Sequence, residues 1–189
     1  MSKIAEEAHE TIHEHGGHGD PFAKRVAVLV SALAAALALT EIGAKSTQNE
    51  YLKDHIAVSD DYAYYQARNL RALLKETEAT VLSHVPSADD PKVQVTIKAD
   101  KDYADRMRDD PKSGEGMKQL LERAKQREEL RDESFHHYHI YEFAGGALEI
   151  AIVLASVAVV TTMAPLAYAA FAIGGVASLV AGCVAMGLF

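Results

Sequence analysis

The stretch AGGALEIAIVLASVAVVTTMAPLAYAAFAIGGVASLVAGCVAMGLF, residues 144–189, decides the fold of this chain, and its only charged residue is Glu149. A helix rises about 1.5 Å per residue, so roughly 20 apolar residues cross the hydrocarbon core of a bilayer. The stretch is too long for one span, and a proline disfavours the α conformation in the residue before it. We therefore predict two membrane spans, residues 143–164 and 165–189, joined by a tight turn at Pro165.

A second apolar segment, Val26–Ala44, carries only the charge of Glu41. Lys24 and Arg25 precede it, and their long side chains can reach the lipid headgroups. We predict a first span over residues 22–44. A signal peptide cleaved after Ala44 is the alternative, but a polar tail over residues 1–21 comes before the apolar run, which signal peptides do not have.

The charges of the chain are concentrated in that tail and in the block from residue 45 to 142. The net charge is -8, which argues against a nucleic-acid partner because such partners need a basic surface. The single cysteine, Cys183, lies in the last apolar run and cannot form a disulfide within one chain. The fold class predicted is an all-α membrane protein with three transmembrane helices and a helical polar domain between the first and second.

The sequence pattern of the polar block predicts a helical hairpin or coiled coil. We predict a helix over residues 48–85, a second over 91–108 and a third from 115 that continues into the second span, with Gly145–Gly146 as a candidate kink. The short alternation at residues 93–97 is also compatible with a strand. The apolar positions of the first helix are Tyr51, Val58, Tyr62, Tyr65 and Ala72, with Leu52, Ile56, Ala63, Leu70, Leu73 and Leu74 broadening the stripe. This core is small, so we expect oligomerisation to supply part of the burial.

Small residues recur at four-residue steps in each span, and such patterns let neighbouring membrane helices approach closely. The positions are Ala27, Ser31 and Ala35 in the first span, Ala147, Ala151 and Ala155 in the second, and Ala170, Gly174, Ser178 and Gly182 in the third. They predict helix association, either within one chain or between chains.

Two motifs, DYAYYQAR at residues 61–68 and LEIAIVLAS at residues 148–156, accompany a start rich in His and Glu and the sequence PFAKR at residues 21–25. Together they resemble the bacterial membrane family catalogued as domain of unknown function 4337. The resemblance covers almost the whole chain and implies three spans with a helical middle. It implies no activity.

Glu149 and Glu41 are the first candidate site. An ionisable group inside a span is costly and is a functional candidate by default. Both residues lie about one turn inside the boundary that faces the polar domain, so they are predicted to share a depth. In an oligomer they could form a ring of carboxylates that handles a cation. The alternative is that each is hydrated, or neutral and hydrogen-bonded across helices.

Histidines make the second candidate site, for weak metal binding. His9 and His13 share one helix face, a spacing that can chelate a transition metal, and His15 and His18 follow. His136 and His139 are one turn apart at the start of the second span, where anchoring at the membrane interface is the plainer interpretation. Two tyrosines, Tyr62 and Tyr65, are candidates for docking a partner, although packing against the facing helix is the simpler role for both.

No nucleophile elbow, phosphate loop or Cys-rich metal set is present in the sequence, so we predict no enzyme and no cofactor. The predicted function is a structural or interaction module: a membrane-anchored helical scaffold, or an accessory subunit, that contacts the lipid bilayer and either itself or another membrane protein. The alternative is an oligomeric protein that handles ions or metals through the intramembrane carboxylate. The predicted location is the bacterial inner membrane, with Lys24 and Arg25 favouring a polar domain outside the cytoplasm. The alternative is the opposite orientation, which is favoured by the basic residues on the domain side of the spans: Lys45, Lys53, Lys125, Arg127 and Arg131.

Overall fold

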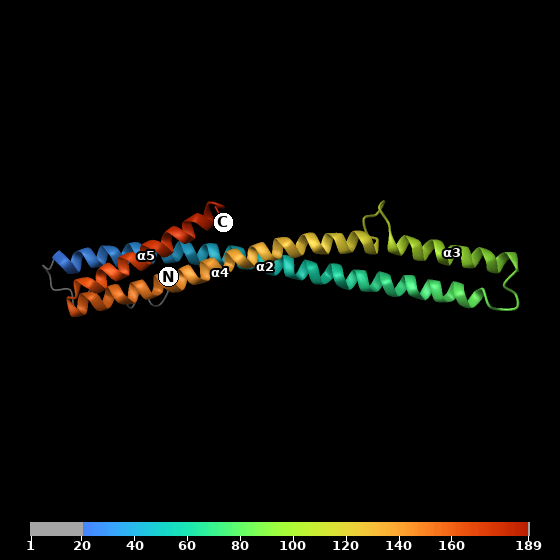
Figure 1. The fold of residues 1–189 in the computed structure, drawn as a ribbon, viewed down its shortest axis with the longest axis horizontal. Coiled ribbons are helices and arrows are strands. Elements are labelled where there is room, and N and C mark those ends of the chain that lie inside the picture. The colour runs from blue at the N-terminus through green and yellow to red at the C-terminus, as the bar shows by residue number, and fades with distance from the viewer. Residues whose placement is uncertain (1–20, 189) are drawn as a thin grey trace. The chain divides into compact units, whose positions relative to one another are not determined.

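A computed structural model describes residues 21–188 as four α-helices without a strand (Figure 1). Their bounds are α2 Pro21–Leu82, α3 Pro91–Arg108, α4 Met117–Thr161 and α5 Ala164–Ala185. The prediction of an all-α fold is confirmed. Residues 93–97 are helical, so the strand alternative is wrong. Asp90 caps α3 by accepting a hydrogen bond from the Lys92 backbone N–H at 2.8 Å, and Pro91 starts the helix with a φ angle suited to it.

Three of the described helices, α2, α4 and α5, are long and apolar enough to cross a membrane. In α2 the first span and the first polar segment form one helix, and in α4 the last polar segment runs into the second span, as predicted. The Gly145–Gly146 pair does not interrupt α4.

The chain divides into two compact units. The apolar unit comprises, of the described residues, 21–50 and 133–188, and the polar unit comprises 51–132. Each is described by itself below.

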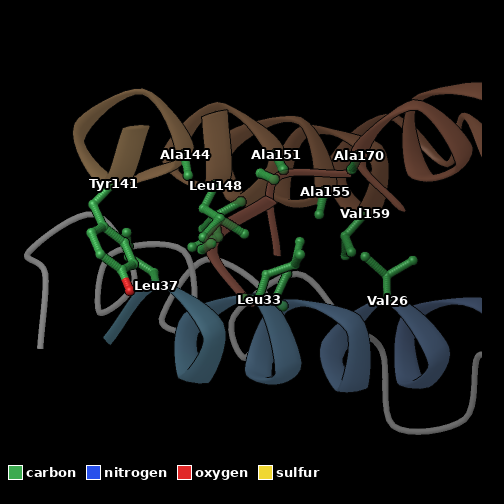
Figure 2. Packing of buried hydrophobic residues seen from close by; sticks show 14 of the residues in the cluster. Val26, Leu33, Leu37, Tyr141, Ala144, Leu148, Ala151, Ala155, Val159 and Ala170 are labelled. Atoms are coloured by element: carbon green, nitrogen blue, oxygen red, sulfur yellow. The ribbon is translucent and has the colours of Figure 1, made fainter. Parts of the chain in front are cut away.

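The apolar unit packs large side chains of α2 against α4 and α5, whose buried faces combine alanines and Gly174 with the larger Leu148 and Ile152. Leu33 and Leu37 of α2 face Ala144, Leu148 and Ala151 of α4 in Figure 2. On α5 the closest approach is at Gly174, where an added Cβ would lie 2.2 Å from Leu33 Cδ2 and 3.4 Å from the Ala151 Cβ. A membrane offers little hydrophobic drive between helices, so this fit of leucine to glycine is what holds α2 near α5.

The buried faces match the predicted small-residue patterns only in part. Ala151, Ala155, Ala170 and Gly174 are buried, as association within the chain requires. On α2, however, Ser31 and Ala35 are exposed. The opposite face of α2 is buried instead, with Val26, Val30, Leu33 and Leu37. Small side chains on one helix pack best against large side chains on its neighbour. The face of α2 that carries Leu33 and Leu37 therefore packs against α4 and α5.

The turn between α4 and α5 places Thr162 at φ 54°, a conformation that β-branched residues rarely adopt. Met163 is the N-cap of α5, and Pro165 stands in the first turn. The α4 and α5 helices, both long and apolar enough to cross a membrane, are therefore joined by a tight turn near Pro165, with the positive φ angle at Thr162 three residues earlier.

The polar unit is an antiparallel helical hairpin, in which the 51–82 segment of α2 pairs with both α3 and the 117–132 segment of α4. Lys75 contacts Asp100 of α3 at 2.9 Å, and Asp61 contacts Arg123 of α4 at 2.7 Å. As the residue number increases along α2, the number of its partner in α3 or α4 decreases. The paired segments are therefore antiparallel.

Candidate functional site

Glu41 and Glu149 line one pocket of the apolar unit, of about 330 Å³. We call it the carboxylate pocket. Its walls come from α2 and α4: Leu37, Thr40, Glu41, Ala44, Tyr141, Glu142, Gly145, Gly146 and Glu149. Both glutamates are half-buried. The sequence indicated a shared depth in the membrane, and the structure places the two side chains at one cavity within a single chain. A role in binding an ion stays a prediction.

Two side chains with a hydroxyl, Tyr141 and Thr40, line this pocket and are buried, with 7% and 4% of their surface exposed. In Figure 2 the Tyr141 side chain extends from α4 toward α2 beside Leu37. Gly43 of α2 makes room for the ring, since a Cβ there would lie 2.7 Å from Tyr141 Cζ, the carbon that carries the hydroxyl. Among the described residues the hydroxyl has no hydrogen-bond partner. Thr40, by contrast, donates its own hydroxyl to the Ala36 carbonyl at 2.9 Å.

The histidines near the second span interact with aromatic and acidic neighbours. His139 Nδ1 lies 3.1 Å from Glu142 Oε2, and its ring meets Phe135 edge-on at 4.3 Å between centroids. The ring centroids of His136 and His137 are 6.3 Å apart. Within residues 21–188 no three His, Cys, Asp or Glu side chains are grouped to hold a metal ion. The remaining predicted ligands, His9, His13, His15 and His18, lie outside the described residues.

The two tyrosines proposed for docking are both half-buried in the polar unit. Tyr62 donates a hydrogen bond to Glu128 Oε1 at 3.3 Å. Burial raises the pKa of the Tyr62 phenol, and the Glu128 charge and hydrogen bond raise it further. Tyr62 therefore joins α2 to α4 within one chain, while docking through Tyr65 stays a prediction.

The polar unit also contains a cluster that the sequence interpretation missed. The carboxylate of Asp61 is buried, and two arginines of α4 bind it. Arg123 donates from Nε and Nη2 to Oδ1 at 2.9 and 2.7 Å, and Arg127 donates from Nη1 to Oδ2 at 2.8 Å. Arg127 Nη1 also reaches the Ala57 carbonyl at 3.2 Å. We call this the Asp61 clamp.

Two further charges are buried along the same hairpin. Arg68 bonds Glu115 at 2.7 Å and the Tyr64 hydroxyl at 3.1 Å. Asp100 of α3 forms an ion pair with Lys75, with 2.9 Å between Oδ1 and the lysine Nζ. Its other oxygen, Oδ2, is buried without a hydrogen-bond partner in the described part of the chain. The signal was available in the sequence: Asp61, Arg68 and Lys75 stand at seven-residue steps, one face of a helix. Part of the charge in the polar block is therefore buried within the hairpin.

The large apolar residues of the same α2 segment face solvent in the described chain. We define the outer stripe as Leu52, Ile56, Leu70, Leu73, Leu74 and Val81, each between 46% and 60% exposed. The prediction that Leu52, Ile56, Leu70, Leu73 and Leu74 belong to the hairpin's apolar stripe is therefore wrong. The face that pairs with α3 and α4 carries Val58, Ala72 and Ala79 beside the paired charges, and these small residues let the charged side chains reach across.

A family model described as a domain of unknown function (DUF4337) matches residues 22–187. The chain belongs to this family. The match includes the whole carboxylate pocket, the Asp61 clamp and the outer stripe, so these features lie inside the family's domain. Neither the comparison with curated proteins nor the one with solved structures finds a match.

The family assignment confirms the resemblance seen in residues 61–68 and 148–156. Three of the described helices are long and apolar enough to cross a membrane, and the described chain between the first and second apolar segments is mostly helical. A domain of unknown function brings no activity with it. The function of this DUF4337 protein therefore has to be argued from the pocket, the clamp and the outer stripe themselves.

Proposed function

We propose that this protein is a membrane-anchored helical scaffold that self-associates through the outer stripe of its polar unit. The observation that supports it is the exposure of six large apolar side chains on one face of α2. Monomeric soluble surfaces rarely keep such a patch uncovered. The occupant we propose is a second copy of the same chain.

The spacing of the outer stripe suits a helix partner. Leu52, Ile56, Leu70, Leu74 and Val81 lie within a narrow arc when 100° is allowed for each residue. Small or polar residues occupy the same arc between Ile56 and Leu70. The four-residue steps from Leu52 to Ile56 and from Leu70 to Leu74, and the seven-residue step from Leu74 to Val81, are spacings found in the seam of a coiled coil.

The pairing of two copies follows from the membrane. Copies inserted in the same orientation run their α2 helices parallel, so a two-fold axis along the stripe brings equivalent residues together. Each half-exposed side chain leaves on the order of 100 Å² of apolar surface, giving roughly 600 Å² per copy, somewhat below the ~800 Å² per partner of a standard interface. We propose that contacts between spans, such as the exposed Ser31 and Ala35 face of α2, supply the remainder.

The test uses the full chain in detergent or nanodiscs, with Cys183→Ser as the background. We expect Leu70→Cys to form a disulfide-linked dimer under mild oxidation. The matched control is Val95→Cys, because Val95 of α3 is also apolar and 69% exposed but lies outside the outer stripe. Light scattering should further show that Leu70→Glu converts the dimer to a monomer while Val95→Glu does not. A monomeric wild type, or equal effects at both positions, would contradict the proposal.

We propose in addition that the protein resides in the bacterial inner membrane with the polar unit outside the cytoplasm, supported by Lys24 and Arg25 beside the first span. A cysteine at Ser113, in the exposed connection between α3 and α4, reports the side. A maleimide that cannot cross membranes should label Ser113→Cys in intact spheroplasts. Labelling only after lysis would place the polar unit in the cytoplasm.

A further inference from the structure

We propose that the carboxylate pocket binds a primary ammonium group. The pocket lies within the apolar unit, between the Leu37–Ala44 segment of α2 and the Tyr141–Glu149 segment of α4. It is distinct from the outer stripe, and the proposal does not depend on self-association.

The charge of the pocket requires a cation. Three carboxylates line it, from Glu41, Glu142 and Glu149, and none of its lining residues is basic. Glu142 already contacts His139 at 3.1 Å. The structure shows no partner for Glu41 or Glu149 among the described residues, and two half-buried carboxylates without partners are costly near the membrane core.

The acceptors match the donors of an ammonium group. A primary ammonium has three N–H donors and no acceptor. The pocket offers the carboxylates of Glu41 and Glu149 and the hydroxyl of Tyr141, a residue that is 7% exposed and whose hydroxyl has no protein hydrogen-bond partner in the described chain. The ring of Tyr141 adds an aromatic surface that attracts cations. These three groups are the acceptors that the pocket presents to an ammonium group.

The size of the pocket favours an organic cation over a bare metal ion. A volume of 330 Å³ compares with about 30 Å³ for a water molecule in the liquid. The three glutamates are not gathered into a metal-binding group within the described residues. Gly145 and Gly146 leave this space open, because neither has a side chain to fill it. An ammonium with its attached carbons fits the volume and the charge.

Two sources share this chemistry: the ethanolamine headgroup of a phospholipid, and a free amine. Glu41 and Glu149 belong to segments that can cross the membrane, so a headgroup could reach them from the bilayer. A choline headgroup is the natural comparison, because its quaternary nitrogen has the same charge but no N–H donor.

The experiment uses the full chain, delipidated in detergent and studied by native mass spectrometry. Phosphatidylethanolamine and phosphatidylcholine with identical acyl chains are added separately, and we expect about tenfold or greater preference for phosphatidylethanolamine, the value of one charge-assisted hydrogen bond. Ethanolamine is then added as competitor. Displacement assigns the binding to the ammonium alone, and retention of the lipid assigns it to headgroup and chains together. Equal retention of the two lipids would overturn the proposal.

Variants separate the pocket from general lipid binding. Glu149→Gln and Glu41→Gln should each reduce the preference by about tenfold, whereas Glu50→Gln, an exposed glutamate of the same unit, should not. Gly146→Leu adds a side chain at a position that lines the pocket, and an added Cβ there meets nothing within 4 Å. Gly175→Leu is the matched control, since its Cβ also meets nothing within 4 Å and it lies outside the pocket. Preference that survives in Gly146→Leu, or disappears equally in Gly175→Leu, would refute an ammonium site here.

Discussion

The Asp61 clamp makes a specific prediction about the stability of the polar unit. Asp61→Asn removes the negative charge that Arg123 and Arg127 share, while it keeps the size and shape of the side chain. The carboxylate oxygens accept three arginine hydrogen bonds of 2.7 to 2.9 Å, and the residue is 4% exposed. The amide presents one acceptor oxygen and turns an N–H₂ group toward a guanidinium, so at least one bond is lost and another is weakened.

The stability lost in Asp61→Asn depends on how exposed Arg123 and Arg127 are. Breaking one partner out of a fully buried ion pair costs about 3–5 kcal/mol, because the remaining charge is stranded. Here the Arg123 and Arg127 side chains are 41% and 36% exposed, so both can recover water. We therefore expect a loss of about 2–3 kcal/mol, which corresponds to roughly a 30- to 150-fold increase in opening of the hairpin.

Hydrogen–deuterium exchange of the full chain in detergent measures this opening directly, because amide exchange reports the free energy of local unfolding. Peptides around Asp61 in α2 and around Arg123 in α4 should exchange faster together. Asp60→Asn is the matched control, since the neighbouring aspartate is exposed and its loss should change exchange less than about twofold. If Asp61→Asn changed exchange by less than about threefold, or if Asp60→Asn had the same effect, the clamp would not stabilise the hairpin as argued.

Two other perturbations test the packing of the apolar unit and the pH dependence of the polar unit. Gly174→Val should destabilise the apolar unit by about 1–3 kcal/mol through collision with Leu33, with recovery in the Gly174→Val/Leu33→Ala double variant and no loss in Gly175→Val, as measured by thermal unfolding in detergent. The hydrogen bond from Arg108 holds the pKa of Glu76 below its ordinary value. A lowered folded-state pKa contributes stability above the unfolded-state pKa, near pH 4, and that stability is lost as the pH falls through the folded value. Thermal melts between about pH 7 and pH 3 should therefore show a decline that Glu76→Gln reduces, and an unchanged slope in that variant would refute the assignment.

Much of the membrane fold could be predicted from the sequence because length and apolarity alone determine a span. The two spans after residue 142 follow from one uninterrupted run and a proline, and the same depth argument brought Glu41 and Glu149 together. Tyr141 was not predictable as a pocket residue. Its burial depends on Gly43 of the facing helix, and a contact about 100 positions away along the chain leaves no periodic signal in either segment.

The polar hairpin shows why periodicity is ambiguous when a helix has two patterned faces. Residues of α2 such as Leu70 and Leu74 repeat at helical steps, and so do Asp61 and Arg68 on the opposite face. Hydrophobicity favours the leucine face as the interior. The charged face is interior in the structure because α3 and α4 present matching partners for it, and no single segment reveals that match.

The buried charges do more than compensate one another, because they determine the register of the hairpin. Asp61 meets Arg123, while Arg68 meets Glu115 seven residues further along α2. A slip of one heptad in one direction would place Arg68 against Arg123, and a slip in the other would place Asp61 against Glu115. Each slip sets one pair of like charges opposite each other, which disfavours the wrong pairing. Charges at these positions thus favour one alignment of α2, in which its leucine face is exposed.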